Sequence, residues 1–244
     1  MKRIAIATPT YNEAGNIKKL ILEIEKVCKN IPDISFTLFV IDDSSPDGTA
    51  KIAQETAKKV KTTNFSVKVL VRKIKDGIGR AYIYGFNEIL KGKFDYIIQI
   101  DADLSHDPKY IKDLVDQARI GKDFVSASRY MKGGGIADWG LHRRILSRGG
   151  NIYTRLFLDK RITDYTNGLN MYSVPLMKEI NIDTLDSDGY GFFIELKHKI
   201  LPLSRNYGQI PLILTDRKHG KSKIPRNTIL INLALVPKLH FKKK

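Results

Sequence analysis

Cysteine is almost absent from this chain of 244 residues: Cys28 is the only one, so no internal disulfide can form. It lies in an amphipathic helical pattern, where we expect a buried small hydrophobic side chain. Long apolar runs are missing too. Residues 229–236 are interrupted by Asn232 and are far fewer than the roughly 20 residues that a membrane-spanning helix needs. The apolar run at the amino end is too short for a signal peptide, and we expect no segment to cross a membrane.

Two common nucleotide-binding motifs are also missing. No Gly-Lys-Ser/Thr of the P-loop type occurs, and in the glycine-bearing turn at residues 75–82, Tyr82 stands where the dinucleotide fingerprint has its third glycine. These absences argue against a P-loop enzyme and a nicotinamide-dependent dehydrogenase. Acidic residues are scarce relative to basic ones: 26 Asp and Glu against 42 Lys and Arg give a net charge of +16. This excess indicates an anionic partner, either nucleic acid, an acidic lipid surface or a phosphorylated substrate.

The remaining composition, 42% hydrophobic and 28% charged, is that of a folded protein. Short apolar segments alternate with helical periodicity along the first half of the chain. The predicted strands are residues 4–8, 36–41, 67–71 and 96–100, and the predicted helices are residues 17–27, 49–60, 78–90 and 108–120. Regular alternation of this kind predicts an α/β fold with a mostly parallel central sheet and helices on both faces.

The other motifs are arranged around residues 96–108. An apolar segment there leads into Asp101 and Asp103, and Pro108 is placed to open a helix. Two charges about 4 Å apart repel by roughly 4 kcal/mol at an effective dielectric near 20, so the pair favours a cation between them. Two oxygen ligands suit Mg²⁺ or Mn²⁺, which complete their shells with water and substrate phosphates. The simpler alternative is that Asp101 caps the strand and that Asp103 or Ser105 caps the helix.

The other predicted strands of the first half end at Thr8-Pro9, at Asp42-Asp43 and at Arg72. Because ligands gather at the carboxyl ends of the strands in a parallel sheet, we expect these residues to lie beside the carboxylate pair. This arrangement favours a nucleotide bound through its ribose hydroxyls and base edge, with its diphosphate bridged by metal. Turn and cap formation is the alternative for Asp42, Asp43 and Asp47.

Arginines gather in the second half around the glycines at residues 133–135, which predict a mobile loop beside the site. They are Arg129, Arg143, Arg144 and Arg148. Arg143 and Ser147 share one face of a helix predicted over residues 143–158. A guanidinium with a hydroxyl beside it suits a phosphate monoester better than a lysine does. A simple solvated basic face is the alternative, and we favour phosphate recognition.

Three motifs, at residues 8–13, 41–49 and 101–108, resemble those of the nucleotide-diphospho-sugar transferases of the GT-A fold. Among these, the chain resembles the dolichol-phosphate (polyprenol-phosphate) mannosyltransferases, in the short catalytic-subunit form without transmembrane helices. The resemblance continues in order through residues 128–130, 134–135, 139, 143, 147–151, 164–168, 189–192 and 216–223. Each motif is weak alone, but the series spans nearly the whole chain.

The resemblance implies a role for individual residues. Pro9, Tyr11, Glu13 and Asp42 would line the nucleotide. Asp101 and Asp103 would hold Mg²⁺ or Mn²⁺, with Asp103 nearer the sugar diphosphate; Ser105 stands where the family often has a third, glutamine ligand, so water would take that place. Arg129, Arg143 and Ser147 would receive the phosphate of the acceptor, and Arg217 and Lys223 would close over the donor diphosphate. The catalytic residues would be Asp103, Arg129 and Arg217.

The implied activity is metal-dependent, inverting transfer of mannose from GDP-mannose to dolichyl or polyprenyl phosphate. The acceptor phosphate is largely a dianion at neutral pH, so no general base is needed. We therefore give His106 a structural role and Glu195 a supporting one, such as orienting an arginine. Glucose transfer from UDP-glucose is the alternative within the family.

The resemblance also implies peripheral attachment to the cytosolic side of a membrane, the endoplasmic reticulum in a eukaryote or the plasma membrane in a prokaryote. We expect one catalytic domain over residues 1–223. Residues 224–244 would form a basic and apolar tail that docks on the lipid surface or on small membrane subunits.

Two functions of other classes remain as alternatives. A nucleic-acid-binding module would explain the charge but gives no use for Asp101 and Asp103, and no stacking aromatic pattern supports it. We therefore expect no nucleic-acid partner. A metal-dependent nucleotide-sugar hydrolase or nucleotidyl transferase would use the same donor without a lipid acceptor.

Overall fold

The computed structural model describes residues 1–216 and 228–241. Within these residues a central sheet has the strand order β3-β2-β1-β4-β7-β5-β8, and β6 and β9 form a separate pair. The strands of the main sheet are β1 (Lys2–Thr10), β2 (Ile34–Asp42), β3 (Phe65–Val71), β4 (Tyr96–Gln99), β5 (Phe124–Ser128), β7 (Asn170–Ser173) and β8 (Tyr207–Pro211). The pair consists of β6 (Gly135–Ile136) and β9 (Ile213–Leu214).

Strands β1 to β4 are parallel to one another, whereas β7 runs antiparallel to both β4 and β5. Thr10 at the end of β1 lies opposite Asp42 at the end of β2, and Ala7 lies opposite Gln99 near the end of β4. The carboxyl ends of these strands therefore share one edge of the sheet. The predicted mostly parallel α/β fold is confirmed.

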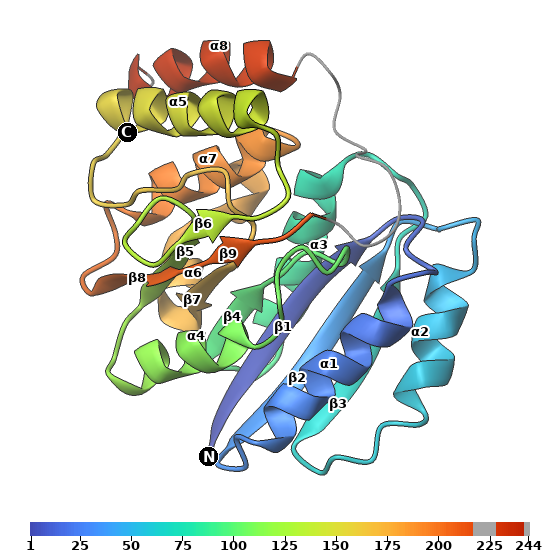
Figure 1. Ribbon diagram of the computed structural model, residues 1–244. Coiled ribbons are helices and arrows are strands. Elements are labelled where there is room, and N and C mark those ends of the chain that lie inside the picture. Colours follow the sequence, from blue (N-terminus) through green and yellow to red (C-terminus); the bar gives the residue numbers. More distant parts are fainter. Residues whose placement is uncertain (217–227, 242–244) are drawn as a thin grey trace.

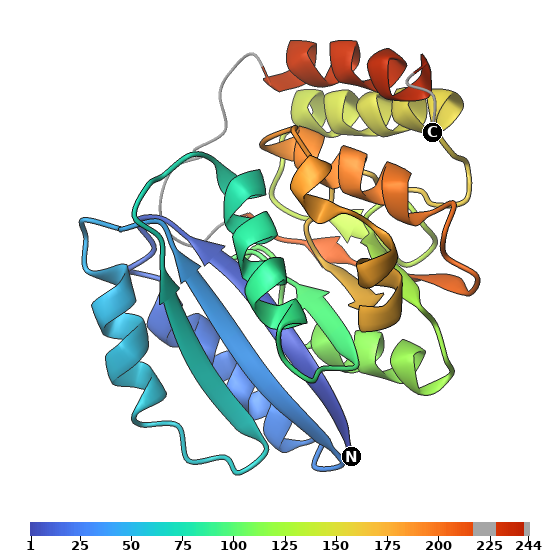
Figure 2. The ribbon, with the colours of Figure 1, turned by 180° about the vertical axis from the view of Figure 1, so that it is seen from behind.

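Helices cover both faces of the sheet (Figures 1 and 2). On one face lie α1 (Ile17–Lys29), α2 (Thr49–Ala57) and α4 (Tyr110–Arg119), and on the other lie α3 (Ile78–Leu90), α6 (Val174–Glu179) and α7 (Tyr190–Ile200). A short 3₁₀ helix, η1 (Ile182–Thr184), precedes α7. Strand residues alternate between the two cores: Ile4 and Ile6 face α1, whereas Ala5 and Ala7 face α3, as the two-residue period of a strand requires.

Helix α1 shows how the spacing of apolar residues alone predicts a helix in the first half of the chain. Ile17, Leu20, Ile21, Ile24 and Cys28 follow helical spacing and are all completely buried. The predicted burial of the cysteine is therefore confirmed. Burial also raises the pKa of its thiol, which suppresses the reactive thiolate.

Two further helices, α5 (Leu141–Phe157) and α8 (Thr228–Phe241), lie side by side at one end of the molecule (Figures 1 and 2). The Tyr153 hydroxyl of α5 donates to the Leu233 carbonyl of α8 over 3.0 Å. Val236 and Leu239 of α8 are buried in the core that includes α7. The expected carboxyl-terminal tail thus includes a helix that packs on α5 and α7. In the described residues, no helix combines the length and apolarity required to span a membrane.

The glycine-rich stretch that we expected as a mobile loop contains β6. Its Gly135 N–H donates to the Leu212 carbonyl over 2.9 Å, and Ile136 pairs with Leu214. A Cβ atom at Gly134 would lie only 2.4 Å from the Ser128 carbonyl oxygen. The stretch is therefore tied to the body by strand pairing, and glycine permits its close approach to β5.

Candidate active site

A cavity of about 410 Å³ opens at the edge where the parallel strands end. Most of the predicted site residues line it, although they come from both halves of the chain. They are Pro9, Tyr11, Glu13, Asp101, Asp103, Arg129 and Arg143. Asp42 and Ser147 do not line it, and Arg217 and Lys223 lie outside the described residues.

Asp101 is held in place at the floor of the cavity. The Tyr82 hydroxyl donates to Asp101 Oδ1 over 3.1 Å. Burial, and then the charge of Asp101, raise the pKa of Tyr82 well above its usual value, so this phenol stays a donor. A Cβ atom at Gly168 would lie 2.8 Å from both carboxylate oxygens. Because glycine has no Cβ atom, Gly168 makes room for this carboxylate.

Asp103 lies two residues further along, where the Ser105 N–H donates to its Oδ1 over 3.0 Å. The helix that follows, α4, has no side-chain cap at Lys109, and Asp107 rather than Asp103 accepts from the Lys109 N–H, over 2.9 Å. Helix capping therefore does not explain Asp103. No group of three or more His, Cys, Asp or Glu among the described residues is arranged to hold a metal. Two carboxylates with no third such ligand among residues 1–216 and 228–241 fit a cation that shares its shell with a substrate diphosphate.

His106 is buried beside this pair with a defined tautomer. Because the Asn167 amide nitrogen donates to the Ala127 and Leu169 carbonyls, the Asn167 oxygen accepts from His106 Nε2, at 2.8 Å. The other nitrogen, Nδ1, lies 3.6 Å from Asp101 Oδ2. The histidine thus bridges two elements of the cavity wall, in keeping with a structural role.

At the end of β1 and just after it, Pro9, Tyr11 and Glu13 line the cavity together with Lys75, a residue that we did not predict. The ammonium of Lys75 lies 3.9 Å from the centroid of the Tyr11 ring. A cation over an aromatic face is attracted to it by the quadrupole of the ring. The segment before α3 therefore adds a positive charge to this wall.

The two adjacent aspartates at the end of β2 have different surroundings. Asp42 is completely buried and accepts from the Thr10 hydroxyl over 2.9 Å and from the Ser45 hydroxyl over 2.6 Å. Asp43 lines the cavity, and Arg72 Nη1 donates to it over 2.7 Å. Burial raises the pKa of Asp43 to about 6, although the positive charge of Arg72 opposes the shift. Thus Asp43 lines the cavity, whereas the predicted Asp42 is buried and does not line it.

Asp47 stabilises a turn, which was the alternative to a ligand-binding role for this residue. Its carboxylate accepts from the Thr49 N–H and the Ala14 N–H, both over 3.0 Å. These bonds connect the start of α2 to the segment after β1.

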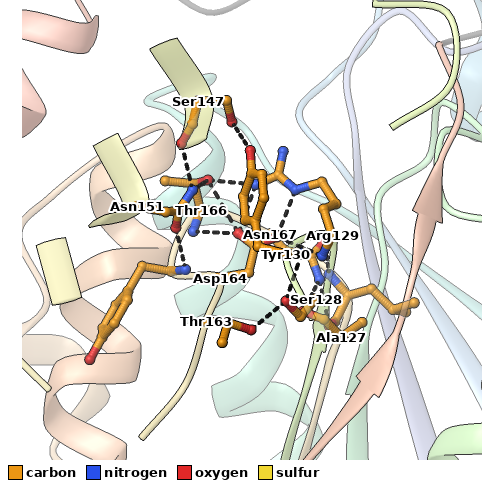
Figure 3. A network of polar contacts seen from close by, with 12 residues as sticks. Ala127, Ser128, Arg129, Tyr130, Ser147, Asn151, Thr163, Asp164, Thr166 and Asn167 are labelled. Carbon is orange, nitrogen blue, oxygen red and sulfur yellow. Dashed lines mark hydrogen bonds and ion pairs between the residues drawn. The ribbon is translucent and has the colours of Figure 1, made fainter. Parts of the chain in front are cut away.

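On the opposite side of the cavity, Arg129 is nearly buried in an ion pair with Asp164 (Figure 3). Its Nε and Nη2 donate to the two carboxylate oxygens over 2.6 and 2.7 Å, and Nη2 also donates to the Thr166 hydroxyl over 2.7 Å. Burial alone would raise the pKa of Asp164, but Arg129 holds it below the usual range. The guanidinium is thereby fixed in one orientation.

Arg143 lies on the same side but is about half exposed, and its guanidinium lies 3.5 Å from the centroid of the Trp139 ring. Its Nη1 is 3.7 Å from Asp216 Oδ1. Ser147 instead accepts a hydrogen bond from the Tyr130 hydroxyl over 2.6 Å (Figure 3). The structure therefore brings the two predicted arginines to one wall and directs the predicted serine hydroxyl to Tyr130.

Two acidic residues anchor the segment before α7. Glu195 accepts from the backbone N–H groups of Asp186 and Ser187 over 3.1 and 3.0 Å, so it supports this segment and binds no arginine in the part of the chain that the structure describes. Asp188 accepts from the Gly79 N–H at the start of α3 over 3.0 Å. A Cβ atom at Gly77 would lie 2.4 Å from the Asp188 carboxylate, so this wall requires a glycine there.

A family model, "Glycosyl transferase family 2", matches residues 5–180, which include Asp43, Asp101, Asp103 and Arg129 of the cavity lining. The chain belongs to glycosyl transferase family 2. It is a glycosyltransferase with the GT-A fold, as the sequence motifs predicted.

Two curated relatives resemble this glycosyltransferase over most of their length. One, from Micrococcus luteus, is named undecaprenyl-phosphate mannosyltransferase; it is 34% identical over 222 residues, which cover 91% of this chain and 87% of the relative. The other, from Mycolicibacterium smegmatis, is named polyprenol monophosphomannose synthase; it is 32% identical over 228 residues, which cover 93% and 83%. The predicted membership of the polyprenol-phosphate mannosyltransferase family is therefore confirmed.

Solved structures of a more distant enzyme share the fold. Glucosyl-3-phosphoglycerate synthase from Mycobacterium tuberculosis, in complex with Mn²⁺, uridine diphosphate and phosphoglyceric acid, superposes with a TM-score of 0.68 at 18% identity. The match covers 100% of this chain and 80% of that chain.

Proposed function

We propose that this glycosyltransferase transfers mannose from GDP-mannose to a dolichyl or polyprenyl phosphate. The proposal depends on one observation: Asp101 and Asp103 line the same cavity as Arg129 and Arg143. Carboxylates suit a metal-bound diphosphate, and guanidinium groups suit a phosphate monoester. The names of the two curated relatives support mannose as the sugar and a polyprenyl phosphate as the acceptor.

For the donor, we assign recognition of the base to Asp43 in place of Asp42, because only Asp43 lines the cavity. One carboxylate can accept two hydrogen bonds, and guanine presents two adjacent N–H groups on one edge, whereas uracil presents one. The ion pair with Arg72 orients this carboxylate. Pro9, Tyr11 and Glu13 would line the base and the ribose. These features favour GDP-mannose over UDP-glucose.

For the metal, the carboxylate pair fits Mg²⁺ or Mn²⁺. The ion would be held by Asp101 and Asp103. Water would take the place of the glutamine ligand that the family often has at the position of Ser105. The ion would stabilise the charge that grows on the departing diphosphate. Arg217 and Lys223 are proposed to close over that diphosphate, and their positions lie outside the described residues.

The protein residues on the acceptor side hold the nucleophile. A phosphate monoester has a second pKa near 6, so at neutral pH its dianionic oxygen can attack the anomeric carbon without a base. Arg129 and Arg143 would bind the non-attacking oxygens. As the new carbon–oxygen bond forms, the bond to the diphosphate breaks on the opposite side of the sugar. The anomeric configuration is therefore inverted.

The lipid acceptor requires contact with a membrane, and we assign this contact to an α5/α8 face. Its exposed apolar residues are Leu141, Ile145, Leu146, Ile152 and Leu156 of α5, and Ile231, Leu233 and Phe241 of α8. Arg144, Arg148 and Lys238 are exposed on the same helices. An apolar surface with basic residues around it suits an anionic leaflet, where each basic residue is worth about 1 kcal/mol. Attachment would be peripheral, on the cytosolic side.

Vesicle sedimentation tests this contact. Replacing Leu141 and Leu156 together by Glu should abolish binding to vesicles with anionic lipid, while transfer to a short-chain, water-soluble isoprenyl phosphate stays unchanged. Unchanged sedimentation of the double variant would exclude the α5/α8 face. Binding that requires small membrane subunits in the vesicles would assign the contact to them.

The activity itself is tested by incubating purified protein with labelled GDP-mannose, Mg²⁺ or Mn²⁺ and polyprenyl phosphate, and by following the sugar into the lipid phase. UDP-glucose and the unphosphorylated polyprenol serve as parallel controls. Lipid-linked mannose that requires both the metal and the phosphate is expected. Transfer from UDP-glucose alone would overturn the donor assignment. Free mannose without lipid product would favour a hydrolase.

A further inference from the structure

Lys197 places an amino group where lysine is rarely found. It lies on α7, is completely buried and is among the largest fully buried side chains of the described residues. Its helix neighbours Phe193, Leu196 and Ile200 are buried too. Lysine is almost never fully buried without a partner, because removing an ammonium from water is costly. The proposed reaction assigns it no role.

The partners of Lys197 are two carbonyl groups of one segment. Its Nζ donates to the Asp164 carbonyl over 2.9 Å and to the Asn167 carbonyl over 3.0 Å. This segment lies between α5 and β7 and turns along the cavity wall. Its cavity-lining residues are Thr166, Asn167 and Gly168. The amine thus binds both ends of a turn that lines the cavity, whereas Lys197 itself does not line it.

The same turn fixes Arg129. The Asp164 carboxylate is fully buried and binds the Nε and Nη2 of Arg129, and Thr166 accepts a second bond from Nη2 (Figure 3). Nη1 makes no hydrogen bond with any described residue, and Arg129 lines the cavity. A guanidinium held along one edge in this way leaves its other edge for a ligand.

The buried charges around Arg129 do not balance. When Lys197 is protonated, the buried cluster holds two cations, Lys197 and Arg129, and one carboxylate, Asp164. Burial lowers the pKa of Lys197 to about 7, with the charge of Asp164 opposing the shift. An uncompensated buried charge is unfavourable, and an anion beside Arg129 would neutralise it.

We propose that Lys197 is a positioning residue for the acceptor phosphate: it ties the turn at residues 164–168 so that Arg129 faces the cavity, and its ammonium supplies positive charge that the bound phosphate neutralises. The inference rests on the proposed function, because it takes the ligand of Arg129 to be the phosphate of the acceptor. It predicts that Lys197 affects acceptor use and not donor use.

The test compares Lys197→Met with a matched control on the same helix. Lys199 lies two residues along, and its Nζ donates to the Thr184 hydroxyl over 2.6 Å, remote from the cavity lining. For Lys197→Met we expect the KM for a short-chain isoprenyl phosphate to rise about tenfold while the KM for GDP-mannose stays within about twofold. Lys199→Met should match the wild type in both constants.

Equal changes in the two KM values, or no change in the KM for the acceptor, would overturn the inference. If Lys197→Met does not fold, Lys197→Gln decides by the same criterion, because it removes the charge but keeps a donor for the carbonyls. The wild-type protein must first transfer mannose to the phosphate. Failure at that stage refutes the proposed function, whereas failure confined to the variants refutes only the role of Lys197.

Discussion

The two walls of the cavity are built in different ways. The wall that we assign to the donor, here called the donor wall, includes Asp101, Asp103 and Asp43, which follow directly from the ends of parallel strands and line the cavity. The wall that we assign to the acceptor, the acceptor wall, includes Arg129, which depends on Asp164, a residue 35 positions away, for its orientation. The first wall is fixed by local sequence and sheet geometry, whereas the second is fixed by long-range pairing of buried charges. Substitutions should therefore affect chemistry on the first wall, and stability or acceptor use on the second.

The largest effect is expected on the donor wall. Asp103→Asn keeps the shape of the side chain but removes a metal-binding charge, so kcat should fall about a thousandfold, because a metal supplies several kcal/mol of charge stabilisation and each 1.36 kcal/mol is tenfold in rate. Asp107→Asn is the matched control, because Asp107 accepts from the Lys109 N–H, pairs with the Lys109 ammonium and does not line the cavity. Activity of Asp103→Asn within threefold of wild type would refute the metal assignment.

On the acceptor wall, Asp164→Asn should chiefly affect stability. Removing one partner of a buried ion pair costs about 3–5 kcal/mol, because the other charge stays buried. At about 2–4 °C per kcal/mol for a chain of this size, the Tm measured by calorimetry should fall by roughly 10 °C. The control is Asp159→Asn, whose partly exposed pair with Arg161 is worth about 1 kcal/mol or less. An equal fall in Tm in the two variants would mean that the buried ion pair contributes no more stability than the partly exposed one.

Arg143→Ala tests whether the two walls serve different substrates. Because Arg143 lines the cavity beside Arg129, the KM for the phosphate acceptor should rise about tenfold while the KM for GDP-mannose changes less than about twofold. Arg144 is exposed and does not line the cavity, so with a short-chain, water-soluble isoprenyl phosphate as the acceptor Arg144→Ala should leave both constants unchanged. Weaker donor binding in Arg143→Ala would move this arginine to the donor wall.

The smallest effect is a pH dependence at Asp43. Since its pKa is raised to about 6, the carboxyl group becomes protonated as the pH falls below that value and loses acceptor capacity for the base. The KM for GDP-mannose should then rise a few-fold between pH 7 and pH 5, and Asp43→Asn should remove that dependence. Because the raised pKa favours the protonated folded state, the associated stability is complete below about pH 4 and is lost as the pH rises through 6. A wild-type donor KM that is constant over this range would contradict the assignment.

The sequence predicted the donor wall well because its rules are local. An apolar strand followed by Asp101 and Asp103 needs only the rule that ligands gather at the carboxyl ends of parallel strands. The position of Asp42 could not be predicted from the motif: neighbouring strand residues point in opposite directions, so a shift of one residue decides which carboxylate reaches the cavity. The resemblance named Asp42, which is buried, whereas Asp43 lines the cavity.

The acceptor wall could not be derived in the same way. The spacing of Arg143 and Ser147 places both residues on one side of α5. It could not show that the Tyr130 hydroxyl donates a hydrogen bond to the Ser147 hydroxyl. Nothing local indicates that Lys197 binds the carbonyl groups of a distant turn. Such pairings depend on the tertiary packing of α7 against the turn.

The most direct test of the central claim is the anomeric configuration of the lipid-linked sugar formed by the wild-type protein from GDP-mannose and polyprenyl phosphate, determined by NMR of the purified product. A cavity with a diphosphate on one wall and a phosphate nucleophile on the other predicts mannose joined to the lipid phosphate, with the configuration opposite to that in the donor. Retained configuration, or a sugar joined to a lipid without phosphate, would contradict the account.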